Sequence, residues 1–146
     1  YRDFKIPIIV LRPFNIYGEG QSDQFLISKL INASIKEVCV DIYDLDAKRD
    51  YLWIGDFING MIKVIKKEQK GIDVYNIGSG VSYSAQDIIS IISTYSTPVI
   101  YTSESDGSKL LIKDCVCDNG LFSKKFDWSP GVSLKSGVQN LVNYIK

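Results

Sequence analysis

Polar side chains that could bind an anionic ligand follow an apolar run near the start of the chain. Residues 8–11 are four consecutive large apolar side chains, and Arg12, Asn15 and Tyr17 come soon after them. Such a run is typical of a strand covered on both faces, and binding crevices form beyond the carboxyl ends of these strands in α/β proteins. The sequence therefore predicts that the three polar side chains stand at the mouth of a crevice.

Apolar periodicity along the rest of the chain predicts alternating strands and helices. Short apolar runs and period-two alternation predict strands at 8–11, 37–42, 51–54, 74–77 and 99–101. Helical spacing and cap residues predict helices that begin soon after residues 22–23, 56, 84, 118 and 133. The alternation favours an α/β fold.

Three packing details follow from the same patterns. The strands at 37–42 and 51–54 are expected to form a hairpin-like pair. The turn at 78–80, Gly-Ser-Gly, looks like a phosphate cradle but lacks the lysine of a P-loop, so we interpret it as structural. The helix capped by Asp56 is expected to bury one face, made of Phe57, Ile58, Met61, Ile62 and Ile65.

The composition is that of one globular domain with no strong charge. The chain has 146 residues, 45% of them hydrophobic, and 17 basic residues balance 17 acidic ones. This balance gives no general electrostatic footprint for nucleic acid or for an anionic membrane. The apolar stretches are shorter than the roughly 18 residues of a membrane span, and no leader opens the chain, so a cytoplasmic protein is expected.

Cysteine and histidine usage indicates that no metal site is present. The three cysteines, Cys39, Cys115 and Cys117, form an odd set that suits a reducing compartment better than a disulfide framework. The Cys-x-Cys spacing is what two residues on one face of a short strand produce. Because the chain has no histidine, a His-based catalytic triad and a His-ligated zinc site are excluded within it.

Four segments together resemble one enzyme family. Residues 11–21, LRPFNIYGEGQ, resemble the motif "LRPFNVYGPGQ" of NAD-dependent nucleotide-sugar epimerases and dehydratases, the extended short-chain dehydrogenase/reductase family. Residues 49–56 resemble its "RDFIYVDD" segment, residues 74–80 match "VYNIGSG", and residues 126–137 resemble "LGWSPxxSLxxG". The resemblance implies that residues 1–21 end a Rossmann-type parallel sheet. It implies that residues 22–146 form the small mixed α/β substrate-binding lobe.

The resemblance also implies where NAD and the sugar would lie. Asn15 would hydrogen-bond the diphosphate or the sugar, and backbone around Phe14 would line the nicotinamide side of NAD. The alternative for Asn15 is an Asx turn that stabilises the loop. Tyr17 would border the sugar pocket or pack under the turn, and Arg12 is more simply a structural partner for loop carbonyls.

Further implied contacts concern the nucleotide, which is expected to be a UDP-sugar. Arg49 is the best candidate for the diphosphate contact, because a planar guanidinium binds phosphate oxygens bidentately. Asp50 is expected to position Arg49 or the hairpin, and the alternative for Arg49 is an ordinary surface ion pair with Asp50. Lys109 offers only a point charge where many family members carry a second arginine. The strand that holds uracil in the uridine-using members corresponds to Val38, Cys39 and Val40.

The catalytic part of the family pattern is not found in this chain. No Gly-x-x-Gly-x-x-Gly turn follows a strand, and the Tyr-x-x-x-Lys spacing of Tyr1 and Lys5 stands too close to the strand at 8–11 to be the catalytic pair. We therefore expect no catalytic residue here, no turnover by these residues alone, and a homodimer for the intact enzyme. The alternative is a free-standing nucleotide-sugar-binding or partner-interaction domain without catalysis.

Overall fold

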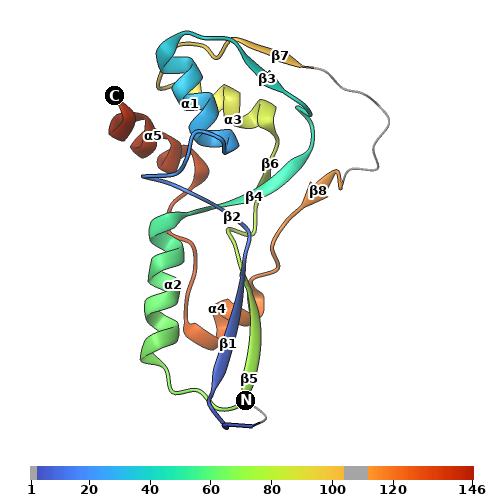
Figure 1. The fold of residues 1–146 in the computed structure, drawn as a ribbon, viewed down its shortest axis with the longest axis vertical. Coiled ribbons are helices and arrows are strands. Elements are labelled where there is room, and N and C mark those ends of the chain that lie inside the picture. Colours follow the sequence, from blue (N-terminus) through green and yellow to red (C-terminus); the bar gives the residue numbers. More distant parts are fainter. Residues whose placement is uncertain (1–2, 104–111) are drawn as a thin grey trace.

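The computed structural model describes residues 3–103 and 112–146 (Figure 1). It has two lobes, and the strand at Lys48–Trp53 runs from one to the other. The strands are β1 (Ile8–Pro13), β2 (Asn15–Tyr17), β3 (Val40–Ile42), β4 (Lys48–Trp53), β5 (Ile72–Ile77), β6 (Ser82–Tyr83), β7 (Tyr101–Ser103) and β8 (Asp114–Cys115). The helices are α1 (Leu26–Lys36), α2 (Ile54–Lys66), α3 (Ala85–Ile92), α4 (Gly120–Phe126) and α5 (Leu134–Ile145). The predicted α/β fold is confirmed.

The helical lobe consists of α1, α3 and α5 with β3 and β7, and its core is closed. The apolar faces of the three helices meet, and Leu30, Ile88 and Val138 are fully buried among them. The predicted start of α3 is confirmed, because Ser84 and Asp87 form a reciprocal capping box. The start of α5 is confirmed as well, since the Ser133 hydroxyl accepts from the backbone N–H of Ser136.

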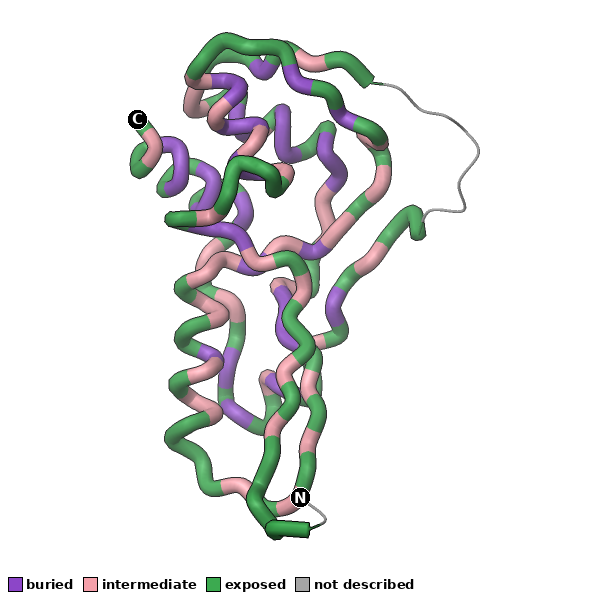
Figure 2. Tube along the Cα trace, viewed as in Figure 1, coloured by how far each residue is buried: buried purple, intermediate pink, exposed green. Residues whose placement is uncertain are grey.

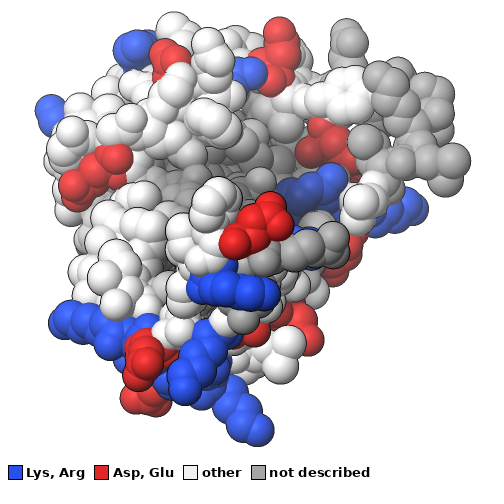
Figure 3. All heavy atoms as spheres, turned by 60° about the horizontal axis from the view of Figure 1, so that its bottom comes forward, with Lys and Arg blue, Asp and Glu red and all other residues white. Residues whose placement is uncertain are grey.

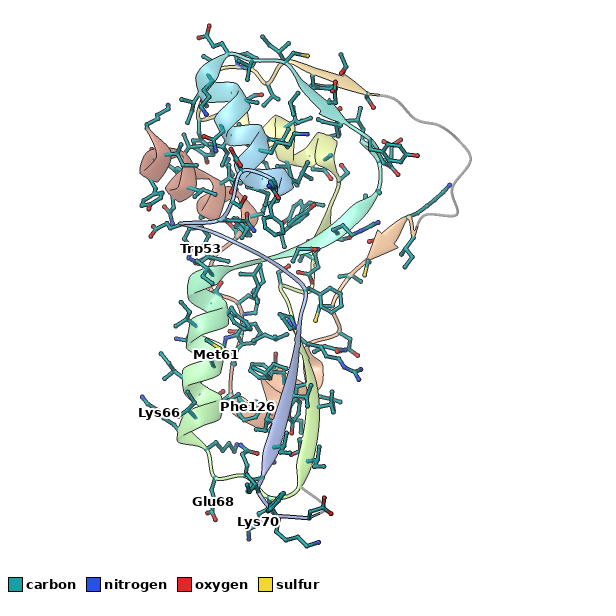
Figure 4. The ribbon with its side chains drawn as sticks, viewed as in Figure 1. Trp53, Met61, Lys66, Glu68, Lys70 and Phe126 are labelled. Atoms are coloured by element: carbon teal, nitrogen blue, oxygen red, sulfur yellow. The ribbon has the colours of Figure 1, made fainter. Side chains whose placement is uncertain are left out.

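The sheet lobe consists of β1 and β5 with α2 and α4. The two strands pair in parallel, with Ile8 opposite Ile72 and Pro13 opposite Ile77. A small core of mostly aromatic side chains fills the space between the strands and the helices, and Figure 4 shows Phe126 of this core between α2 and β1. Its buried members are Leu52, Ile77, Phe122, Phe126 and Trp128.

The expectation that the strand at 8–11 is covered on both faces is wrong for the described residues. Ile9 and Leu11 pack against the aromatic core, whereas Ile8 and Val10 are exposed. The side chains of a strand alternate between its faces, and α2 and α4 cover one face of the pair only. Figure 2 accordingly shows few buried residues along β1 and β5.

The predicted buried face of α2 is confirmed for Phe57 and wrong for three other residues. Phe57 and Val64 pack against the aromatic core, whereas Ile58, Ile62 and Ile65 are exposed. The apolar side of the helix is wider than its contact with the sheet, so periodicity alone does not decide which part of that side is covered.

The predicted hairpin between 37–42 and 51–54 does not form. The strand β3 pairs in parallel with β7, while β4 pairs in parallel with β2 and β8 and antiparallel with β6. Val40 and Ile42 belong to the core of the helical lobe, whereas Leu52 belongs to that of the sheet lobe. Each segment instead pairs with strands that are distant in sequence, which no local pattern specifies.

The surface carries both signs of charge. On the face shown in Figure 3, acidic side chains lie between the lysines and arginines. None of the described helices is long and apolar enough to cross a membrane. The domain boundary after residue 21 stays a prediction, although the partner strand of β1 comes from beyond it.

Candidate functional site

The Gly-Ser-Gly turn at 78–80 does hold an anion, and that anion is a side chain of the protein. The fully buried carboxylate of Asp50 accepts from the backbone N–H groups of Ser79 and Gly80, both at 2.8 Å, and from the Ser79 hydroxyl at 2.7 Å. Successive backbone N–H groups in a turn form such anion-binding concavities. The structural interpretation of the turn is therefore confirmed.

The same carboxylate binds a third segment. The backbone N–H of Cys117 donates to Asp50 Oδ2 at 3.1 Å. A Cβ atom on Gly78 would lie 2.5 Å from the Cβ of Cys117, so this close approach requires glycine. Burial, with the nearby Asp50 charge, raises the pKa of the Cys117 thiol to about 12, which keeps the thiol protonated at neutral pH.

Asn15 stands where β1 ends and β2 begins, next to β4. Its side-chain amide donates to the backbone carbonyl of Asp50 at 2.9 Å, which fixes the plane of the amide. The residue pairs in register with Tyr51 across the parallel strands. One amide N–H and the carbonyl oxygen remain as the chemistry that this side chain could offer a ligand.

A cavity of about 170 Å³ lies beside Asn15. The first turn of α1 closes one side of this cavity and Tyr51 closes another. Gln21 holds the loop in place, because its amide donates to the Ile16 carbonyl at 2.7 Å. The lining residues are Asn15, Ile16, Tyr17, Gln21, Phe25, Leu26, Ile27 and Tyr51.

Tyr17 lies at this cavity but is packed against the helical lobe. It is only 2% exposed, and its ring meets that of Trp53 edge to face, with 5.4 Å between centroids. A Cβ on Gly137 would come within 2.0 Å of the Tyr17 hydroxyl, so α5 approaches the ring closely. Burial, reinforced by the charge of Asp56, raises the pKa of Tyr17 far above its ordinary value, so its hydroxyl is neutral at physiological pH.

Arg49 does not form the ion pair with Asp50 that was one reading of the sequence. Its Nη1 atom donates to the backbone carbonyls of Lys48 and Ile112, at 2.7 and 2.8 Å. Ile112 lies two residues before β8, which pairs with β4 beside Arg49. A guanidinium has five N–H donors, so the residue retains the capacity to bind further oxygens.

The residues predicted to contact the base lie in a second cavity, of about 230 Å³. Val38, Cys39 and Val40 form one side of it and α1 forms the other. Two lysines, Lys29 and Lys36, are at its rim. The structure thus places this cavity and the one at Asn15 on the same helix, α1.

Tyr51 is the residue that the sequence analysis missed. It also lines a third cavity, of about 290 Å³, together with Ser79, Tyr83 and the segment 130–134 before α5. Burial raises the pKa of Tyr51 and the charge of Arg49 lowers it, with burial the larger effect. The period-two spacing from Arg49 along β4 was the signal that could have identified it.

The other predicted site residues are distributed around these cavities. The half-buried Phe14 follows β1, and its backbone N–H donates to the Ile77 carbonyl at 2.9 Å, at the carboxyl ends of the paired strands. Arg12 is exposed on β1. Lys109 lies outside the described residues. Among residues 3–103 and 112–146, no group of acidic or cysteine side chains could hold a metal ion.

The chemistry available in this region suits a polar ligand that carries phosphate. Asn15 supplies an amide, Arg49 supplies a fixed positive charge, and Val38 to Val40 line a cavity whose other side carries Lys29 and Lys36. Arg49 and the backbone suit phosphate oxygens, while the cavity at Asn15 combines polar and aromatic groups.

Comparison with known proteins gives the same indication. A family model described as "NAD dependent epimerase/dehydratase family" matches residues 1–78. An uncharacterized UDP-glucose epimerase of Bacillus subtilis is 26% identical over 145 residues, covering 99% of this chain and 46% of that protein. The dTDP-L-rhamnose 4-epimerase of Burkholderia thailandensis is 28% identical, covering 97% of this chain and 40% of the relative.

Solved structures agree with the sequence relatives. The UDP-glucuronic acid 4-epimerase of Bacillus cereus, in complex with UDP-glucuronic acid and NAD, matches with a TM-score of 0.86 and 29% identity. The match covers 99% of this chain and 46% of that one, so the chain spans less than half the length of the relatives described here. Since the family model matches more than half of its residues, the chain belongs to the NAD-dependent epimerase/dehydratase family.

Proposed function

We propose that this chain is the nucleotide-sugar-binding part of an NAD-dependent nucleotide-sugar epimerase or dehydratase, and that the intact protein is a UDP-glucose 4-epimerase. Relatives of this chain include epimerases named for UDP-glucose and for dTDP-L-rhamnose. A protein of similar fold was solved with UDP-glucuronic acid and NAD. The cytoplasmic location and the homodimer belong to the same proposal.

The observation that carries the proposal is the pair of cavities on α1. One is lined by Asn15 and the first turn of α1, and the other by Val38, Cys39 and Val40. A nucleotide sugar has a base at one end and a sugar at the other, with a diphosphate between them. We assign the base to the cavity at Val38–Val40 and the sugar to the cavity at Asn15, with Arg49 as the diphosphate ligand.

The residues present also fit one edge of NAD. The aromatic ring of Phe14 is half-buried at the carboxyl ends of β1 and β5, where α/β sheets bind their ligands. Phe14 and Asn15 would line the nicotinamide there. NAD supplies reversible hydride transfer when bound, and the residues of this chain contribute orientation of the substrate beside it.

Calorimetry of UDP binding to the chain tests this proposal. Arg49→Ala is expected to weaken UDP binding about tenfold or more, because a charge-assisted hydrogen bond contributes about 1.5–3 kcal/mol. Lys48→Ala is the matched control, since Lys48 precedes Arg49 on β4, carries the same charge and is exposed. Equal affinities for the unaltered chain and Arg49→Ala would remove Arg49 from the site.

A turnover assay tests the division of labour. With NAD and UDP-glucose added, these residues alone are expected to give no epimerisation, because the chain contributes binding groups and no assigned acid or base. Formation of UDP-galactose by the purified chain would contradict this expectation.

A further inference from the structure

The buried carboxylate of Asp50 accepts hydrogen bonds from two segments that are distant from it in the sequence. It lies at the centre of a cluster that joins β4, the turn after β5 and the segment after β8. All four hydrogen bonds to it come from neutral donors, namely three backbone N–H groups and the Ser79 hydroxyl. A buried charge held by hydrogen bonds alone is costly to leave unsatisfied, so the cluster keeps one geometry.

The segment 112–117 is attached to β4 at successive points. The backbone N–H of Lys48 donates to the Lys113 carbonyl at 2.8 Å, and residues 114–115 pair with residues 48–49. The Cys117 N–H then donates to Asp50. The carboxylate thus anchors the carboxyl-terminal end of this short segment.

Arg49 depends on the other end of the same segment. Its Nη1 atom donates to the Ile112 carbonyl at 2.8 Å, which orients the guanidinium across the edge of β8. Adjacent strand residues point to opposite faces, so Arg49 and Asp50 do not meet directly. The hydrogen bonds that link the two side chains run through the segment 112–117, from the Cys117 N–H on Asp50 to the Ile112 carbonyl on Arg49.

We infer that Asp50 is a positioning residue for Arg49, acting through the segment 112–117 that carries the Ile112 carbonyl. This inference rests on the proposed function, because it concerns how Arg49 binds a nucleoside diphosphate. Releasing the Cys117 N–H removes the attachment at the carboxyl-terminal end of the segment. The remaining bonds to β4 then hold the Ile112 carbonyl, and with it the guanidinium, in a less fixed direction. A guanidinium that points in another direction loses bidentate phosphate binding, because such binding depends on geometry as well as on charge.

The test is UDP binding by calorimetry to the full chain and to Asp50→Asn. The amide has the same size but places an N–H₂ group against backbone donors, so UDP binding is expected to weaken at least tenfold. Asp56→Asn is the control, because the Asp56 carboxylate also accepts a backbone N–H, that of Val132 at 2.9 Å, but has no bond to the segment 112–117. It is expected to change UDP binding less than twofold.

A double variant separates positioning from general damage to the fold. In the Arg49→Ala background, Asp50→Asn is expected to weaken UDP binding less than twofold further, because the group through which it acts is gone. If the double variant loses UDP affinity by the full product of the two single-variant losses, Asp50 does not act through Arg49 and the inference is overturned.

Hydrogen exchange tests the inference without any substitution. If the hydrogen bonds of Asp50 strengthen UDP binding, then by thermodynamic linkage bound UDP must stabilise those hydrogen bonds. UDP is therefore expected to slow exchange of the Gly80 and Cys117 amides, and unchanged rates would overturn the inference even if Asp50→Asn fails to fold. A chain that binds no UDP overturns the proposed function and this inference together, whereas UDP binding that Asp50→Asn leaves intact overturns the inference alone.

Discussion

The helical lobe and the sheet lobe bury their apolar residues to very different extents. In the helical lobe, the apolar stripes of α1, α3 and α5 face one another and enclose their core. In the sheet lobe, one face of β1 and β5 packs on aromatic rings, and the other exposes Ile8, Val10, Ile72 and Val74. Trp53, at the junction of the lobes in Figure 4, ends the strand that belongs to both.

The difference shows which part of the chain is complete by itself. Contiguous exposed apolar surface is typical of an interface or of an association hazard. The open face of the sheet lobe is therefore the surface that we expect to be covered, whereas the helices of the other lobe already enclose its core. Four experiments challenge or sharpen this comparison.

The largest expected effect is that of Phe122→Ala in the sheet lobe. Phe122 is fully buried and meets the rings of Tyr75, Phe126 and Trp128, so removing it should lower the free energy of unfolding by about 3–5 kcal/mol. Urea unfolding followed by circular dichroism measures it. The neighbouring Leu121→Ala is the control, because Leu121 is 74% exposed and its loss should cost less than about 0.5 kcal/mol. A similar loss in free energy of unfolding for both variants would mean that the aromatic cluster does not stabilise the fold.

The second effect concerns the open face. The unaltered chain is expected to self-associate, and the double variant Val10→Lys, Val74→Lys is expected to be largely monomeric, because the two residues are paired in register on the exposed face. Sedimentation velocity measures the change. Tyr144→Lys, which removes an exposed aromatic ring from α5 instead, should leave association as it was. A monomeric unaltered chain would contradict the comparison between the lobes.

The third effect is smaller and belongs to the helical lobe. Ser84→Ala removes half of the capping box of α3 and should cost about 1 kcal/mol. Hydrogen bonds from Ser84 lower the pKa of Asp87, so this stabilisation is present above the ordinary carboxyl range and is lost as the pH falls through the lowered pKa. The difference between Ser84→Ala and the unaltered chain should therefore shrink in acid. If the difference in free energy of unfolding stays constant down to about pH 2, the stabilisation by the cap does not depend on the charge of Asp87.

The smallest effect is expected at the contact between the lobes. The buried hydroxyl of Tyr17 has no hydrogen-bond partner within the described part of the chain, so Tyr17→Phe should change the free energy of unfolding by less than about 1 kcal/mol. Burial raises the pKa of Tyr17. The stabilisation of the fold by the neutral Tyr17 side chain is therefore complete below about pH 10 and is lost as the pH rises through the raised pKa. Phenolate absorbance of the unaltered chain should consequently show a late-ionising tyrosine that is missing in Tyr17→Phe. A large loss of stability in Tyr17→Phe would indicate a bonded hydroxyl.

Most of the local structure could be predicted from the sequence. The capping box at Ser84 and the start of α5 at Ser133 are encoded within a few residues, and the structure confirms both. The predicted caps of α1 and α2 are wrong: Phe25 and Trp53 are the N-cap residues, neither has a side-chain cap hydrogen bond, and Asp56 lies inside α2. The other errors concern long-range pairing and coverage. The partner of β3 is β7, some 60 residues away, and no local pattern specifies such a pairing.

For the candidate site, too, local features could be predicted and long-range contacts could not. Asn15 and the segment Val38–Val40 could be proposed from motif and pattern, and each lies at a cavity. Tyr51 was missed because its role depends on being opposite Asn15, a relation between two distant strands. The partner of the Gly-Ser-Gly turn was missed for the same reason, since Asp50 lies 29 residues before Ser79.

The sequence by itself determined the α/β class, how α3 and α5 begin, and which residue types are available for phosphate binding. These properties are local, because caps and apolar periodicity act over a few residues. Only the tertiary structure decided that the Gly-Ser-Gly turn binds Asp50, that Arg49 binds the Ile112 carbonyl, and that one face of β1 and β5 stays open. These depend on contacts between distant segments, which are fixed by how the two cores pack.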